Sequence, residues 1–177
     1  MNSILVVAII RPLACTLLSM LMLAVVSVTS FAQKAVILVR HAEQTPVGGM
    51  MDGDPPLNQM GTQRAAALTS HLKQTGITAI YTSQYARARE TAEPTASELG
   101  ILAQVFPKDD IEGLVQRLKE KHAQDIVLVV AHSDTIPMLL KSWGHKQPLE
   151  VGKADFGSMW FVVPRQNQQT VVSRLQF

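Results

Sequence analysis

The sequence predicts an α/β fold: a three-layer sandwich with a largely parallel sheet, helices on both faces and an antiparallel edge. Short, nearly all-apolar runs such as Ala35–Val39 and Asp125–Ala131 are typical of strands buried on both faces of a parallel sheet. Amphipathic segments of helical period alternate with these runs, which is the pattern of βαβ units. The last two strand-like runs, Ser158–Val163 and Thr170–Leu175, are separated only by a turn over Pro164–Gln169 and predict a hairpin.

Helices and further strands are expected between these runs. The helices are predicted from amphipathic spacing and from residues that can cap their ends: Asn58 to about Thr75, Ala86–Leu99, Ile111–His122 and Thr135–Trp143. Two more short strands are predicted over Ile77–Thr82 and Leu102–Phe106. Pro94 has to begin a new turn or introduce a kink, because proline lacks the N–H that a helix interior uses. Gln44–Pro56, rich in Gly, Pro and Asp, is expected to be a loop.

The first 32 residues have the composition of a secretory signal peptide. They carry one charge, Arg11, and no acidic residue. An apolar run over Leu13–Val26 follows, and Ser30 and Ala32 are small residues at the two positions that signal peptidase reads. An uncleaved membrane anchor is the alternative, since apolar residues also precede Arg11. We expect cleavage after Ala32 and export to the periplasm, with membrane contact only if the segment stays uncleaved.

One domain is expected over residues 33–177, because no internal repeat or linker divides this part of the chain. The formal net charge of the whole sequence is +2. A nucleic-acid-binding protein normally carries a basic stripe, so this near-neutral balance argues against that class. Any affinity for an anion has to come from a local cluster of side chains.

Two of the predicted strands end abruptly in polar side chains. The first gives way to Arg40 and His41, and the strand that ends at Ala131 gives way to His132 and Ser133. Ligands of open α/β sheets bind in the crevice beyond the carboxyl ends of the strands. A lone histidine there could merely cap its strand by a backbone hydrogen bond. Two such endings, one of them with an arginine, favour a binding pocket.

A third cluster follows the strand predicted over Ile77–Thr82, where a helix carries Arg87 in its first turn. Helix N-termini favour anions through their free N–H groups and the helix dipole, so a cation at this place indicates that an anionic ligand is expected. Arg87 and Arg89 are two residues apart and point in different directions. We expect only one of them to face the pocket and the other to pair with Glu90 or Glu93 on the surface.

These clusters and one further segment resemble the signature of the histidine phosphatase superfamily, also called phosphoglycerate-mutase-like. Residues 40–43 match its Arg-His-Gly/Ala-Glu element, and residues 56–61 match Pro-Leu-Ser/Thr-x-x-Gly with Asn58 in the hydroxyl position. Residues 83–92 match Ser-x-x-x-Arg-Ala-x-x-Thr-Ala, and His132 matches the second histidine. The four elements occur in the family order. More narrowly, the chain is similar to small exported bacterial members.

The resemblance implies a role for each residue of the pocket. His41 would attack phosphorus and form a phosphohistidine, which splits one displacement into two. It has to be neutral to do so. Arg40 and Arg87 would hold the phosphoryl group by charge-assisted hydrogen bonds, and His132 and Ser133 would bind the same group.

A general acid is also expected, because the leaving oxygen needs a proton. Many members of the family carry an acidic residue between the arginine helix and the second histidine, and one branch has Asp directly after that histidine; this chain departs from both patterns. The candidates are Asp109, Asp110 and Asp134, and Asp110 can equally be the N-cap of the following helix. Glu43 is expected either to orient groups near the pocket or to lie on the surface.

The sequence therefore predicts a phosphoric monoester hydrolase with a small phosphorylated molecule as substrate. No metal and no cofactor are expected, because the remaining histidines, His71, His122 and His145, are scattered and are interpreted as surface or helix-end residues. Hydrolysis is favoured over mutase action because the chain lacks the larger insertions of mutases. The alternatives are a phosphohistidine or protein phosphatase, and a catalytically weak phosphate-binding module.

Overall fold

The computed structural model of this protein describes residues 34–46, 53–165 and 170–177. The signal peptide predicted over residues 1–32 lies outside this range. Among the described residues, no helix is both long enough and apolar enough to cross a membrane.

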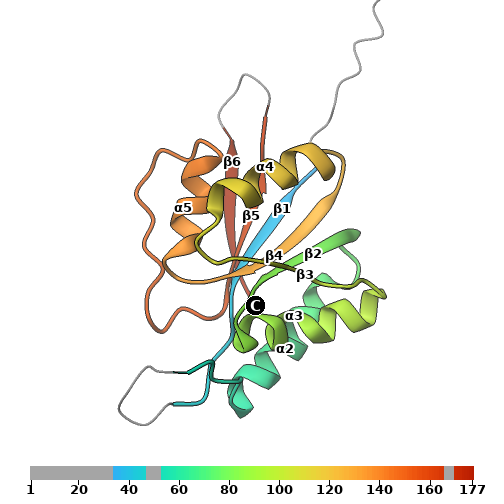
Figure 1. Cartoon of the computed structure of the whole chain (residues 1–177), viewed down its shortest axis with the longest axis vertical. Helices are drawn as coiled ribbons and strands as arrows, with labels where there is room; N and C mark the ends of the chain where they lie inside the picture. The colour runs from blue at the N-terminus through green and yellow to red at the C-terminus, as the bar shows by residue number, and fades with distance from the viewer. Residues whose placement is uncertain (1–33, 47–52, 166–169) are drawn as a thin grey trace, which may run out of the picture. The chain divides into compact units, whose positions relative to one another are not determined.

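The described residues form one mixed sheet with helices packed on it (Figure 1). The strands are β1 (Val36–Arg40), β2 (Ile77–Ser83), β3 (Gln104–Phe106), β4 (Ile126–Ala131), β5 (Ser158–Val163) and β6 (Val171–Gln176). The helices are α2 (Gln59–Leu72), α3 (Ala86–Leu99), α4 (Ile111–Lys121) and α5 (Thr135–Ser142). The predicted α/β class is confirmed.

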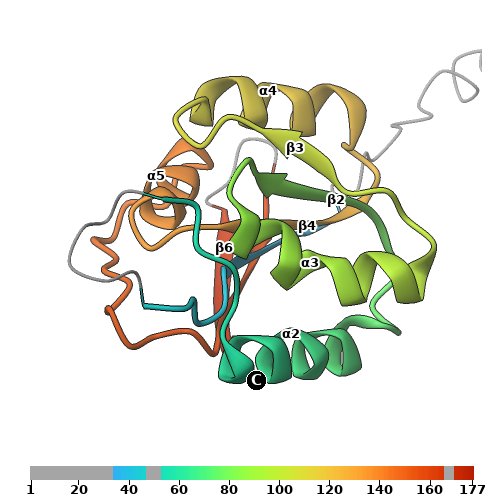
Figure 2. The ribbon, with the colours of Figure 1, turned by 60° about the horizontal axis from the view of Figure 1, so that its bottom comes forward.

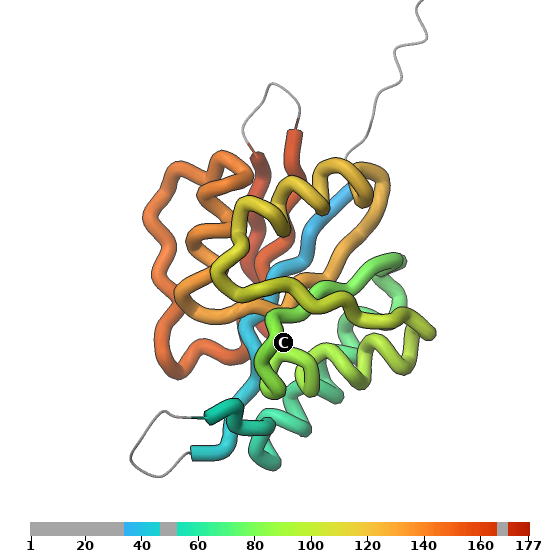
Figure 3. The backbone as a smooth tube through the Cα atoms, viewed as in Figure 1, coloured from blue at the N-terminus to red at the C-terminus, as the bar shows by residue number. Residues whose placement is uncertain are grey.

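The strands of the sheet follow the order β3-β2-β4-β1-β5-β6. The first four in this order are parallel to one another, β5 is antiparallel to β1, and β6 is antiparallel to β5. Figure 3 shows β1, in blue, running between the orange β4 and the hairpin of β5 and β6. The largely parallel sheet with an antiparallel edge is therefore confirmed.

Successive side chains of the central strands point to opposite faces, and each face is covered by a pair of helices. Val36 and Leu38 of β1 belong to a core cluster with α4 and α5, whereas Ile37 and Val39 belong to one with α2 and α3. Figure 2 shows the two helix pairs on opposite sides of the sheet. Burial on both faces explains why these strands are continuous apolar runs.

Two details of the helices differ from the expectation. Helix α2 ends at Leu72 rather than near Thr75, because the backbone N–H of Thr75 and its hydroxyl both donate to the Leu72 carbonyl and close a turn. Helix α3 runs unbroken through Pro94. The carbonyl that loses its partner there belongs to the exposed Glu90, where water can replace the missing N–H.

The connections that leave β1 and β4 run to opposite faces of the sheet. The chain passes from β1 to α2 on one face and from β4 to α5 on the other, although the two strands are neighbours. Such a switch point leaves a crevice beyond the carboxyl ends of the two strands, where α/β proteins bind ligands. His41 and His132 are the residues that follow these two ends.

Candidate active site

The carboxyl ends of β1 and β4 bring the two histidines together. The strands are in register with Arg40 opposite Ala131, and the backbone N–H of His41 continues the ladder by donating to the Ala131 carbonyl at 2.9 Å. The ring centroids of His41 and His132 are 5.0 Å apart. Both residues are buried, and they lie together at the carboxyl ends of these two neighbouring strands.

Hydrogen bonds fix which ring nitrogen of His41 carries the proton. Nδ1 lies 2.8 Å from the backbone carbonyl oxygen of Ala42, and a carbonyl can only accept, so Nδ1 is the protonated nitrogen. Nε2 lies 3.3 Å from Nε of Arg87, which donates to it. Nε2 therefore presents a lone pair, which is the form that a nucleophilic histidine requires.

Both histidines are held in the neutral state. Burial lowers the pKa of His41 to about 4, with Arg87 and Arg40 adding to the effect and the Ala42 carbonyl opposing it. Burial also lowers the pKa of His132 to about 3, together with the neighbouring charges. Two imidazoles beside cationic groups in a partly desolvated site are more stable without extra protons.

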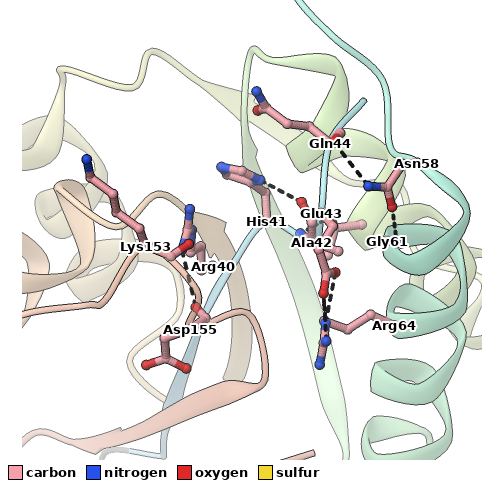
Figure 4. A network of polar contacts seen from close by, with 11 residues as sticks. Arg40, His41, Ala42, Glu43, Gln44, Asn58, Gly61, Arg64, Lys153 and Asp155 are labelled. Atoms are coloured by element: carbon pink, nitrogen blue, oxygen red, sulfur yellow. Dashed lines mark hydrogen bonds and ion pairs between the residues drawn. The ribbon is translucent and has the colours of Figure 1, made fainter. Parts of the chain in front are cut away.

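Arg40 is held by the loop that precedes β5. Its Nη1 donates to the carbonyl oxygens of Gly152 and Lys153 at 3.0 and 2.9 Å; Figure 4 shows Arg40 beside Lys153. Its guanidinium carbon lies 3.9 Å from the centre of the Phe156 ring. Its Nε is buried and has no partner among the described residues. An unpaired buried donor is costly, and a bound phosphoryl oxygen could satisfy it.

Arg87 and Arg89 lie on the first turn of α3, and they separate as expected. Arg87 is mostly buried, is stacked on the Tyr85 ring at 4.4 Å and faces His41. The side chain of Arg89 is half exposed. The predicted pairing of Arg89 with Glu90 or Glu93 is wrong. Arg89 pairs with Asp54 instead, because the loop before α2 passes this end of the helix, and it also donates to the Gln84 carbonyl.

Asp54 occupies the N-terminus of α3. Its two carboxylate oxygens lie 2.7 and 2.8 Å from the backbone nitrogen of Ala86, and they lie 3.7 Å from Arg87 and 3.9 Å from Arg89. The sequence indicated an anionic ligand at this helix end. The structure places the chain's own carboxylate there, where it complements the positive end of the helix dipole.

The hydroxyl of Thr91 connects two halves of the site. It donates to the Arg87 carbonyl at 2.6 Å and accepts the backbone N–H of Ala42 at 2.9 Å. Thr91 is buried in α3, one turn after Arg87. Thr91 therefore connects the segment that carries His41 to the helix that carries Arg87. It can do so because it lies one helical turn after Arg87.

The remaining signature residues hold the loop after β1 against α2 (Figure 4). Glu43 forms a bidentate ion pair with Arg64, with an Nη2–Oε1 distance of 2.6 Å. Asn58 caps α2 by accepting from the Gly61 N–H, and its own N–H donates to the Glu43 carbonyl. A Cβ at Gly61 would collide with that carbonyl, so only glycine fits. Glu43 therefore helps to hold the loop after β1 against α2.

The three candidate acids lie in different surroundings. Asp110 is the N-cap of α4 and accepts from the Gly113 N–H, and Asp109 is exposed beside it. Asp134 is 60% exposed and pairs with Lys108 at 2.6 Å. Partial burial would raise the pKa of Asp134, but the hydrogen bond and charge of Lys108 outweigh it and lower the pKa. Asp134 is thus a carboxylate at neutral pH.

The other pocket residue and the other histidines are placed as follows. Ser133 lies between His132 and the α5 cap, partly buried. His71 is exposed on α2 and His145 is partly buried after α5. His122 ends α4 as predicted, but it is not a free surface residue: its ring lies 3.0 Å from the Tyr81 hydroxyl and 2.7 Å from Asp125. Within the described ranges, no three metal-ligating side chains gather.

Sequence reasoning did not find the supports of the two arginines. Phe156 and the carbonyls of Gly152 and Lys153 hold Arg40, and Asp54 and Tyr85 hold Arg87. Backbone carbonyls leave no trace in a sequence. For Asp54, the only available signal was an acidic residue directly before Pro55.

Residues 36–112 match the model of the histidine phosphatase superfamily, branch 1. The matched segment runs from β1 to the start of α4 and supports a place for this chain in the histidine phosphatase superfamily. No curated protein sequence matches the chain significantly.

Solved structures share the fold at low sequence identity. The protein histidine phosphatase SixA in complex with tungstate is 19% identical, with a TM-score of 0.64, and the match covers 80% of this chain and 96% of that one. A mycobacterial glucosyl-3-phosphoglycerate phosphatase in complex with inorganic phosphate is 16% identical, with a TM-score of 0.63, and the match covers 81% and 96%.

Proposed function

We propose that this protein is a metal-independent phosphatase that hydrolyses a phosphomonoester through a phosphohistidine on Nε2 of His41. The observation that carries the proposal is the pair of contacts on the His41 ring. Nδ1 is protonated against the Ala42 carbonyl, and Nε2 presents its lone pair towards Arg87. A neutral, oriented imidazole beside guanidinium groups is suited to attack a phosphoryl group.

The reaction takes two displacements. In the first, the Nε2 lone pair forms a bond to phosphorus while the bond to the leaving oxygen breaks, and that oxygen takes up a proton from water in the open site. In the second, water attacks phosphorus, the N–P bond breaks, and phosphate leaves with His41 neutral again. Arg40, Arg87 and His132 bind the phosphoryl oxygens and stabilise the charge that they carry in the transition state.

A phosphohistidine or protein phosphatase is the second candidate, and one observation favours it. Asp134, the candidate acid whose charge reaches both histidines, is an ionised partner of Lys108. A leaving group that departs easily, such as an imidazole, needs less help from a general acid than an alkoxide. SixA is described as a protein histidine phosphatase, which supports the same class.

Export is also proposed, with residues 1–32 as a cleaved signal peptide and the phosphatase domain acting in the periplasm. The support is the single charge of this segment, its apolar run and its small residues at the exit. Determination of the N-terminal residue of the protein recovered from the periplasm tests this proposal: Gln33 is expected, and Met1 would contradict it.

The nucleophile is tested with His41→Ala and with His71→Ala as its matched control. His71 is exposed on α2 and bonds only within its own helix turn, to the Ala67 carbonyl. Hydrolysis of p-nitrophenyl phosphate is measured with and without EDTA. We expect EDTA to have no effect, His71→Ala to keep wild-type turnover, and His41→Ala to lose about three orders of magnitude or more. His41→Ala at wild-type activity would refute the nucleophile.

A substrate panel separates the candidate functions. Sugar phosphates and other phosphomonoesters are compared with a phosphohistidine-containing protein, and acid-labile phosphate on His41 is trapped by rapid quenching. Faster turnover of phosphohistidine than of any ester would select the second candidate. Vanadate binding without turnover of any member would select the phosphate-binding module.

A further inference from the structure

Ser83 and His132 form a buried pair at the carboxyl ends of β2 and β4. The Ser83 hydroxyl oxygen lies 2.7 Å from Nε2 of His132, and both residues are almost completely excluded from solvent. No other hydrogen bond to the Ser83 hydroxyl is formed by the described residues. The position of His132 is fixed independently, since its backbone N–H donates to the Thr135 hydroxyl at 2.9 Å.

The direction of this hydrogen bond follows from the cost of unpaired groups. If His132 donated from Nε2, the hydroxyl hydrogen of Ser83 would be left without an acceptor in a buried place. If Ser83 donates instead, its hydrogen and the Nε2 lone pair satisfy each other. A buried unpaired O–H is costly, whereas a hydroxyl oxygen with an unused lone pair is common.

The second ring nitrogen of His132 then carries the proton. Nδ1 has no hydrogen-bond partner among the described residues. It also keeps some contact with solvent, because it is not one of the fully buried, unpaired polar atoms of these residues. The His132 ring also lies 5.0 Å from the His41 ring, centroid to centroid. A proton on Nδ1 is therefore available to a ligand that enters the pocket.

We propose that Ser83 is a positioning residue that holds His132 in the Nδ1–H tautomer, so that a neutral imidazole donates a hydrogen bond to the substrate's phosphoryl oxygen. The inference rests on the proposed phosphatase function. In the other tautomer, the Nδ1 lone pair would face the negatively charged phosphoryl group and repel it. Partners that orient a metal-ligating histidine in this way change activity by about 10-fold to 100-fold when they are removed, and we expect an effect of similar size here.

The chain supplies a matched control beside Ser83. Thr82 is the preceding residue of β2, is equally buried, and has a hydroxyl with no partner in the described part of the chain. Thr82→Val therefore removes a buried hydroxyl from the same strand without touching His132. Ser83→Ala removes the proposed donor, and Ser83→Thr keeps an O–H at the same position.

The test combines a spectroscopic and a kinetic readout on the full chain. The ¹⁵N chemical shifts of the two ring nitrogens of His132 are recorded at pH 7, with His132→Gln used to assign them. The kcat for p-nitrophenyl phosphate and the inhibition constant of vanadate are measured for each variant. Circular dichroism establishes that each variant is folded.

The expected result is an Nδ1–H tautomer in the wild type and in Thr82→Val. In Ser83→Ala, we expect the proton to shift to Nε2, with kcat lowered about 10-fold to 100-fold and vanadate binding weakened; Ser83→Thr restores both. An Nε2–H tautomer in the wild type, or an unchanged tautomer in folded Ser83→Ala, would overturn the inference. The ring shifts need no turnover, so they decide the tautomer even if the proposed phosphatase activity fails.

Discussion

Nε of Arg87 lies 3.3 Å from Nε2 of His41, whereas the other ring nitrogen, Nδ1, is bonded to the backbone. In the proposed reaction, an incoming phosphoryl group has to displace this contact to reach Nε2. Arg87 therefore aligns the lone pair in the free protein and can transfer its hydrogen bonds to phosphoryl oxygens when substrate binds. This exchange makes the shape of the guanidinium, and not only its charge, important.

Arg87→Lys tests that argument. Lysine keeps the positive charge but lacks the forked N–H groups that contact His41 and phosphoryl oxygens together. We expect kcat/KM to fall by about 100-fold to 1,000-fold, the range seen when one transition-state donor is removed. Arg89→Lys, in the same helix turn but half exposed, is the control and should stay within about threefold of wild type. Equal effects of the two changes would contradict the assignment.

The pH dependence of stability tests the neutral histidines. The pKa values of His41 and His132 are about 4 and about 3 in the folded state, compared with about 6.5 in an unfolded chain. Between about pH 3 and pH 6.5 the unfolded state binds more protons than the folded state, so the free energy of unfolding rises with pH in this range. The stabilisation from the neutral histidines is therefore lost progressively as the pH falls below about 6.5. The His41 shift alone corresponds to about 3 kcal/mol.

Denaturant unfolding of wild type and of the double variant His41→Asn/His132→Gln between pH 7.5 and pH 4.5 measures this contribution. The wild type should lose more stability than the double variant over this range, by about 5 kcal/mol, with roughly half from each histidine. The same slope in both proteins would show that the histidines are not held neutral.

Asp54→Asn should separate stability from anion affinity. Its carboxylate favours the N-terminus of α3 and also places a negative charge 3.7 Å from Arg87. Removing the charge should lower the free energy of unfolding by about 0.5–1 kcal/mol. It should also tighten vanadate binding several-fold at low salt, because Arg87 is no longer neutralised. Weaker binding of vanadate would show that Asp54 orients Arg87 more than it competes for it.

Asp110→Ala distinguishes a helix cap from a general acid. Its side chain accepts from the Gly113 N–H at 3.0 Å, so its loss should reduce the free energy of unfolding by about 1 kcal/mol and leave kcat within about threefold. Asp109→Ala, at the exposed neighbouring position, should change neither quantity. A stable Asp110→Ala protein with kcat lowered about 100-fold would instead identify Asp110 as the acid.

The order and type of the elements could be predicted from the sequence because the signal is local. Ile37 and Val130 face one core cluster and Leu38 and Val129 face the other, so both runs are apolar throughout, as a strand buried on both faces requires. Helix ends were less certain, as α2 shows. Its last turn depends on where the chain has to turn into β2, a tertiary requirement that overrides helical spacing.

The sequence by itself determined the residues of the candidate pocket: Arg40, His41, Arg87 and His132 stand at strand and helix ends in a recognisable order. Only the tertiary structure decided how they are held. The tautomer of His41 depends on a backbone carbonyl, the hydrogen bond between Ser83 and His132 joins the ends of two strands, and Asp54 contacts α3 from the loop before α2. These contacts join residues distant in sequence or involve backbone atoms, and neither leaves a periodic pattern that a sequence can display.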